Sequence, residues 1–141
     1  MASFPDKNTI LIVDDSPDNL ELMSMLLRNA GYGVLTAGDG KEGFEVARRE
    51  RPNLVVSDVS MPRMDGIEAT RQICGLCPHT HVVMLTIYNS AEHIQHALQA
   101  GASGYVLKEA AGQELVTAIR ALHNGGHYFS PRIDTRHIHR P

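Results

Sequence analysis

The sequence lacks the features of a disulfide-stapled, membrane-spanning or nucleic-acid-binding chain. It has no tryptophan, only two cysteines and 5% aromatic residues among 141, and so few cysteines fit a reducing compartment. No apolar run approaches the ~20 residues of a membrane-spanning helix, and residues 1–8 have no apolar core of signal-peptide length. The formal net charge is −3, whereas a nucleic-acid-binding domain normally has a basic face. We therefore expect a cytoplasmic protein that binds neither membrane nor nucleic acid through this chain.

Short apolar runs alternate with amphipathic segments through most of the chain. The expected strands are residues 9–13, 33–37, 54–58, 81–86 and 104–107. The expected helices are residues 17–30, 39–49, 65–74, 89–100 and 113–124, and their expected caps are Ser16, Asp39, Asp65 and Asn89. Strictly alternating units with buried strands predict an α/β fold, a five-stranded parallel sheet that is doubly wound and flavodoxin-like, with helices on both faces.

Polar side chains stand where four of these apolar runs end. Asp14 and Asp15 follow the first run, Asp58 ends the third, Thr86 ends the fourth and Lys108 follows the fifth. The carboxyl ends of parallel strands share one edge of a sheet, which is where ligands bind in such folds. We expect these five side chains to converge on one small site.

Three carboxylates, a hydroxyl and an amine suit phosphoryl chemistry. Three carboxylates held together repel one another, and a hard divalent cation relieves that repulsion. Oxygen ligands favour Mg²⁺ or Mn²⁺ over zinc. A carboxylate can also act as a nucleophile towards phosphorus and give an acyl phosphate. With Lys108 as counter-cation and Thr86 as hydroxyl donor, we interpret Asp58 as the acceptor of a phosphoryl group.

The ordered set of motifs resembles the CheY-like receiver domain of bacterial two-component response regulators. The resemblance covers roughly residues 9–125, with residues 1–8 as a tail and residues 126–141 as a C-terminal tail or the start of a linker. Its motifs are Asp14-Asp15, Asp58 with Met61-Pro62, Asp65-Gly66, Thr86 and Lys108. Residues 101–109 and 118–131 are similar to the NarL/FixJ subfamily, whose members carry a LuxR-like DNA-binding domain after the receiver.

The resemblance implies a regulator rather than an enzyme. A sensor histidine kinase would phosphorylate Asp58, and the output would be transcription, through a domain outside this chain. A regulator cut after its receiver is favoured over a natural single-domain protein, and a homodimer formed on phosphorylation remains open. Asp15, Asp58 and the backbone carbonyl of Ser60 would hold Mg²⁺ directly, with Asp14 acting mainly through water.

Other residues receive roles from the same resemblance. Thr86 and Lys108 would hold the phosphoryl group, and Tyr105 would be the aromatic residue that changes rotamer on activation, with a plain core role as its rival. Three residues would set access to Asp58 or the lifetime of its phosphoryl group: Ser60, Ile87 and Tyr88.

Two other functions compete with this interpretation. A haloacid-dehalogenase-type phosphohydrolase, dependent on Mg²⁺, also has an aspartyl nucleophile after a buried strand, but needs a second acid two residues later, where this chain has Ser60. A flavodoxin-like cofactor binder would need a Gly-rich or Ser/Thr-rich phosphate loop after the first strand, where Asp14-Asp15 would repel phosphate. The Cys74-Gly75-Leu76-Cys77 pair and the histidines after residue 122 are interpreted as reduced thiols and a solvated tail rather than metal sites.

Overall fold

The structure is a computed structural model that describes residues 9–58, 66–77, 79–87, 91–131 and 133. Within these residues six parallel strands form one sheet in the order β2-β1-β3-β4-β5-β6. The strands are β1 (Thr9–Val13), β2 (Gly33–Ala37), β3 (Leu54–Asp58), β4 (His81–Thr86), β5 (Gly104–Leu107) and β6 (Tyr128–Phe129). The helices are α1 (Pro17–Asn29), α2 (Gly40–Glu50), α3 (Gly66–Leu76), α4 (Ala91–Ala100), α5 (Ala111–His123) and the short 3₁₀ helix η1 (Lys108–Ala110).

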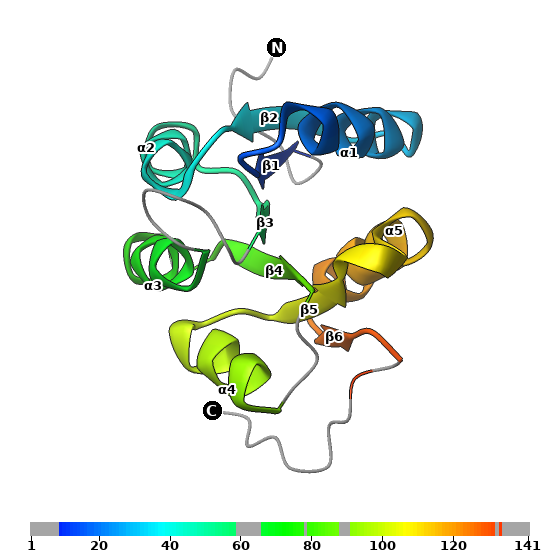
Figure 1. Ribbon diagram of the computed structural model, residues 1–141. Helices are drawn as coiled ribbons and strands as arrows, with labels where there is room; N and C mark the ends of the chain where they lie inside the picture. Colours follow the sequence, from blue (N-terminus) through cyan, green and yellow to red (C-terminus); the bar gives the residue numbers. More distant parts are fainter. Residues whose placement is uncertain (1–8, 59–65, 78, 88–90, 132, 134–141) are drawn as a thin grey trace.

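Helices cover both faces of the sheet. Helices α1 and α5 lie on one face, and α2, α3 and α4 lie on the other (Figure 1). This arrangement confirms the expected doubly wound parallel α/β fold, with one strand more than predicted. None of the helices in the described part of the chain is long and apolar enough to cross a bilayer.

Two helix starts follow the caps expected from the sequence. The Ser16 hydroxyl accepts a hydrogen bond from the Asn19 N–H at the start of α1. The Asp39 carboxylate accepts one from the Glu42 N–H at the start of α2, over 2.8 Å. Each bond satisfies a backbone donor that has no partner within the helix. Two expected caps lie outside the described residues: Asp65 and Asn89.

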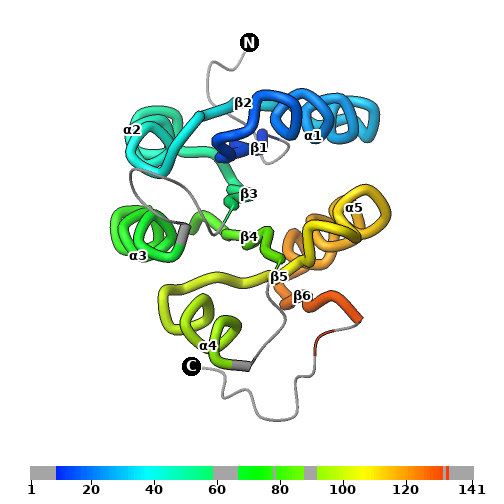
Figure 2. The backbone as a smooth tube through the Cα atoms, in the orientation of Figure 1, coloured from blue at the N-terminus to red at the C-terminus, as the bar shows by residue number. Residues whose placement is uncertain are grey.

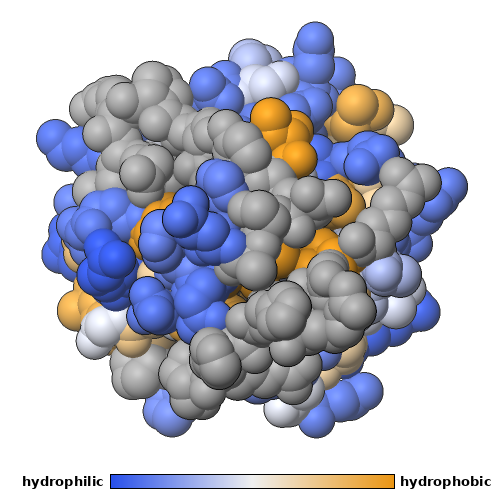
Figure 3. Space-filling model, turned by 60° about the horizontal axis from the view of Figure 1, so that its bottom comes forward, coloured by the Kyte–Doolittle hydropathy of each residue, from blue (hydrophilic) through white to orange (hydrophobic). Residues whose placement is uncertain are grey.

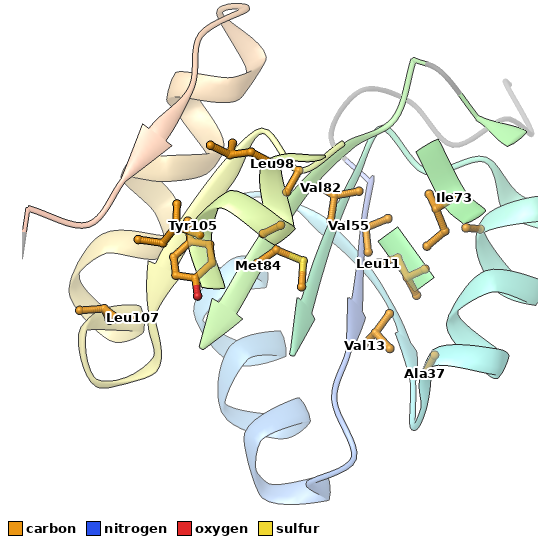
Figure 4. Packing of buried hydrophobic residues seen from close by; sticks show 14 of the residues in the cluster. Leu11, Val13, Ala37, Val55, Ile73, Val82, Met84, Leu98, Tyr105 and Leu107 are labelled. Carbon is orange, nitrogen blue, oxygen red and sulfur yellow. The ribbon is translucent and has the colours of Figure 1, made fainter. Parts of the chain in front are cut away.

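The strands alternate their side chains between two hydrophobic layers. Ile10 and Ile12 of β1 point into the layer under α1 and α5, while Leu11 and Val13 point into the layer under α2, α3 and α4. All four are essentially inaccessible to water, as expected for a parallel sheet covered on both faces. Figure 4 shows the second layer, in which side chains from five strands pack against residues of the covering helices. On the face seen in Figure 3, the coloured surface is mostly hydrophilic, with small hydrophobic areas.

The sixth strand corrects the expectation of five. Tyr128 and Phe129 pair in parallel with Gly104 and Tyr105, so the chain after α5 lies along the open edge of β5 (Figure 2). A Cβ on Gly104 would lie 3.2 Å from side-chain carbons of Leu122 and Val83, so the absent side chain leaves room for these two neighbours. A strand of two residues is too short to give a period-two pattern, so the sequence had no signal for it.

Candidate functional site

Three aspartates form an acidic cluster at the carboxyl ends of β1 and β3. Strand β1 pairs with β3 in a register that places Val13 opposite Ser57, so the following residues, Asp14 and Asp58, emerge side by side. Together with Asp15 they bring one carboxylate oxygen each within 4.8 Å of the others. Within the part of the chain that the structure describes, these three are the acidic, histidine or cysteine side chains that lie close enough together to share a metal ion.

Asp14 has a buried carboxylate with one unsatisfied oxygen. Its Oδ1 accepts a hydrogen bond from the Ser16 N–H over 2.9 Å, whereas its Oδ2 is buried and has no hydrogen-bond partner in the described part of the chain. Burial raises the pKa of Asp14; the Ser16 bond opposes this rise, and the charge of Asp58 adds to it. A buried acceptor without a partner is costly, and a cation beside it would remove that cost.

Asp58 pairs with Lys108 across the end of the intervening strand. The Lys108 ammonium lies 2.9 Å from the Asp58 carboxylate, whose side chain is only 4% exposed. Strand β4 separates β3 from β5, and Leu85 of β4 stands opposite Asp58. Lys108 begins η1 directly after β5, so its long side chain spans the width of one strand. The predicted convergence of Asp14, Asp15, Asp58 and Lys108 is therefore observed.

The other expected site residues that the structure describes differ in how deeply they are buried. Thr86 ends β4 one residue beyond the partner of Asp58 and is 1% exposed. Tyr105 is buried in the hydrophobic layer of α2, α3 and α4, where Figure 4 labels it. The Ile87 side chain is 73% exposed. Two expected residues lie outside the described part of the chain: Ser60 and Tyr88.

A cavity of about 390 Å³ opens beside the cluster, between α1 and the start of α5. Asp14 and Lys108 form part of its wall, so it reaches the acidic cluster. The remaining wall is largely apolar and includes Leu22, Met23, Leu26, Leu85 and Ala111. One of these apolar residues, Leu22 of α1, has a side chain that is 65% exposed. The sequence pattern does not predict this cavity; the one signal for it is an apolar residue, Leu22, on the exposed side of α1.

Comparisons with known proteins agree on one family. Residues 10–120 match the family described as response regulator receiver domain. The probable transcriptional regulatory protein TcrX of Mycobacterium tuberculosis (strain ATCC 25618 / H37Rv) is 40% identical over 114 residues, which are 81% of this chain and 49% of that protein. The transcriptional regulatory protein DegU of Brevibacillus brevis is 32% identical over 130 residues, 91% of this chain and 55% of that protein. The chain thus spans about half the length of the curated relatives it matches.

A solved structure extends the similarity to the fold. The crystal structure of a two-component response regulator of the LuxR family from Aurantimonas sp. SI85-9A1 superposes with a TM-score of 0.83. It is 37% identical in sequence, and the match covers 89% of this chain and 91% of that one. The LuxR-family assignment of this neighbour agrees with the subfamily resemblance seen in residues 101–109 and 118–131.

Proposed function

The chain belongs to the response regulator receiver domain family, and from that premise we propose that it is a phosphorylation-dependent switch in which Asp58 accepts a phosphoryl group from a sensor histidine kinase. The buried Asp58 carboxylate, 2.9 Å from the Lys108 ammonium, is the observation that carries the proposal. A nucleophilic carboxylate needs a nearby cation because the group it receives brings further negative charge. Such a protein is a regulatory signalling domain and assists only its own phosphorylation and dephosphorylation.

The acidic cluster fits a divalent metal ion, for which we propose Mg²⁺ with Mn²⁺ as a substitute. Asp15, Asp58 and the backbone carbonyl of Ser60 would hold the ion directly, and Asp14 would act mainly through water. The unsatisfied Oδ2 of Asp14 and the spacing of the three carboxylates support this assignment, since Mg²⁺ takes a few carboxylates and completes its sphere with water and phosphate oxygens. When bound, the ion neutralises charge on the transferring phosphoryl group.

In the transfer, an Asp58 carboxylate oxygen attacks the phosphorus of a phosphohistidine. The P–N bond breaks, its electron pair leaves with the imidazole, and an acyl phosphate forms on Asp58. The Lys108 ammonium pairs with the phosphoryl oxygens, and the Thr86 hydroxyl donates a hydrogen bond to one of them. Later attack by water on phosphorus releases phosphate and restores the carboxylate. We propose that three side chains set access to Asp58 or the rate of this hydrolysis: Ser60, Ile87 and Tyr88.

The phosphoryl group would shift an equilibrium between two conformations of the domain. A hydrogen bond to the phosphoryl group would draw Thr86 toward Asp58, and Tyr105 would change rotamer in response. The surface near α4, α5 and the edge of β5, where β6 pairs with β5, would then bind its target differently. We propose that this controls transcription through a LuxR-type DNA-binding domain outside this chain, with a homodimer as one form of the active state.

The cavity between α1 and α5 offers a place for the kinase to dock. It combines an apolar wall with direct access to Asp14 and Lys108. Leu22→Glu should leave the fold intact, because Leu22 is 65% exposed, yet slow transfer from a kinase that phosphorylates the wild type by roughly tenfold or more. Transfer from a small phosphodonor should not change. Met25→Glu is the matched control, since Met25 is 56% exposed on the same helix but does not line the cavity.

The phosphoacceptor is tested by incubating the protein with a small phosphodonor and Mg²⁺ and measuring its mass. The wild type should gain one phosphoryl group and Asp58→Asn none, while Asp18→Asn, at an exposed aspartate of α1, should behave as the wild type. An adduct on Asp58→Asn, or none on the wild type, would refute the assignment. Continuous hydrolysis of a small phosphate ester would instead favour a phosphohydrolase.

A further inference from the structure

The chain after α5 is bonded to the backbone that presents Lys108. Beyond the two paired residues of β6, the Ser130 N–H donates a hydrogen bond to the Tyr105 carbonyl oxygen over 3.0 Å. The Ser130 hydroxyl then accepts one from the Leu107 N–H, also over 3.0 Å. Tyr105 and Leu107 are two residues apart, so both face the same neighbour along β5. The serine hydroxyl thus continues the ladder where the backbone of β6 ends.

The hydroxyl of Ser130 is itself fixed by a carboxylate. Its proton is donated to Glu114 Oε1 over 2.7 Å, and the Tyr128 hydroxyl donates to the same oxygen over 3.0 Å. Because the carboxylate of Glu114 accepts both protons, the oxygen of Ser130 is left to accept from Leu107. Ser130 is 1% exposed and Leu107 3%, so water is poorly placed to replace this bond.

Leu107 is the residue immediately before Lys108, whose ammonium must lie beside Asp58. At this point β5 changes into η1, and the backbone of Leu107 has β4 on one side and Ser130 on the other. We propose that Ser130 is a positioning residue for Lys108, acting through the Leu107 N–H, and that the chain leaving the domain is thereby coupled to the phosphoryl site. The family match ends at residue 120, ten residues before Ser130. This inference rests on the proposed role of Asp58 and Lys108 in phosphoryl transfer.

Three variants of Ser130 distinguish a role in positioning Lys108 from an effect on the overall stability of the fold. Ser130→Ala removes the acceptor, Ser130→Thr keeps a hydroxyl, and Ser130→Cys keeps the size but offers only a weak acceptor. With a small phosphodonor and Mg²⁺, Ser130→Ala should phosphorylate roughly five- to twentyfold more slowly than the wild type, because displaced catalytic groups lose rate steeply. Ser130→Thr should restore most of the rate. If Ser130→Ala lacks a cooperative urea transition, Ser130→Cys is measured against the same criteria.

The decisive comparison repeats the change in a Lys108→Ala background. If Ser130 acts through Lys108, its loss should have no further effect there. An undiminished rate for Ser130→Ala, or a loss of equal size with and without Lys108, would overturn the proposal. Amide hydrogen exchange of Leu107 is measured in parallel and should be fast in Ser130→Ala and slow in Ser130→Thr. A wild type that accepts no phosphoryl group would refute the proposed function instead, and Leu107 exchange that does not respond to Ser130→Ala would refute the contact itself.

Discussion

Replacing Asp14 by asparagine should stabilise the metal-free protein while weakening its response to Mg²⁺. Asparagine keeps a side-chain oxygen for the Ser16 N–H, which Asp14 now binds over 2.9 Å. With that oxygen facing Ser16, the amide NH2 takes the place of the unsatisfied Oδ2. It also removes one of three negative charges whose oxygens lie within 4.8 Å of one another. The change therefore removes an electrostatic cost that only a bound cation would otherwise offset.

The expected gain follows from that spacing. Two unit charges 4.8 Å apart repel by about 1 kcal/mol in water and about 3.5 kcal/mol at an effective dielectric constant of 20. Lys108, 2.9 Å from Asp58, already offsets part of this repulsion. We expect a net gain in the free energy of unfolding of roughly 1–2 kcal/mol, equivalent to a rise in Tm of about 2–8 °C for a chain of this size.

The gain should depend on pH in a defined direction. Burial raises the pKa of Asp14 above its ordinary value of 3.8, so the folded state binds this proton more tightly than the unfolded chain does. The stability that protonated Asp14 contributes is fully present below pH 3.8, and it is lost as the pH rises through the pKa of Asp14 in the folded state. The advantage of Asp14→Asn over the wild type should therefore be small in acid and full at neutral pH.

The assay is thermal and urea unfolding with a chelator and again with Mg²⁺. A ligand at ten times its Kd stabilises the native state by about 1.4 kcal/mol, and the wild type should show a gain of that order, whereas Asp14→Asn should show less. Asp18→Asn is the control, because Asp18 is exposed on α1 and lies outside the acidic cluster, so its loss should change metal-free stability by less than about 0.5 kcal/mol and leave the response to Mg²⁺ unchanged. An Asp14→Asn variant less stable than the wild type without metal, or equally stabilised by Mg²⁺, would refute the reasoning.

Two further predictions concern packing and titration. Gly43→Ala should lower the free energy of unfolding in urea by up to about 2 kcal/mol, because the new Cβ would lie 2.8 Å from a Val13 methyl group and overpacking outweighs the better helix propensity. Gly75→Ala is the control and should not destabilise the protein, because nothing lies within 4 Å of its new Cβ. Equal effects of the two substitutions would contradict the overpacking explanation. Burial and the Glu114 hydrogen bond raise the pKa of Tyr128 to about 12, so the stabilisation that follows from its neutral form should persist below pH 10 and be lost between pH 10 and 12. Glu114→Gln should lower this pKa in a spectrophotometric titration, and an unchanged value would argue against the contact.

The sequence predicted the parts of the fold that depend on repeated local patterns. Apolar runs such as Ile10 to Val13 are buried on both faces, and the alternation of strand and helix gave the parallel sheet. Asp14, Asp58 and Lys108 could be brought together in advance, because each stands where a strand ends and all such ends share one edge. The same argument placed Thr86 at that edge.

Features that depend on tertiary contacts were not accessible in this way. Tyr128 and Phe129 form a strand only because β5 has an open edge, and two residues carry no periodicity of their own. The bond from Leu107 to Ser130 joins residues 23 positions apart, and no local pattern marks it. The unsatisfied oxygen of Asp14 likewise becomes apparent only when its surroundings are known.

Phosphorylation of Asp58 is the central claim, and the mass of the protein after incubation with a small phosphodonor and Mg²⁺ tests it most directly. We predict one added phosphoryl group on the wild type, located on Asp58 by peptide mapping, and none on Asp58→Asn or when Mg²⁺ is withheld by a chelator. A wild type that stays unmodified, or an Asp58→Asn variant that is modified to the same extent, would contradict the account.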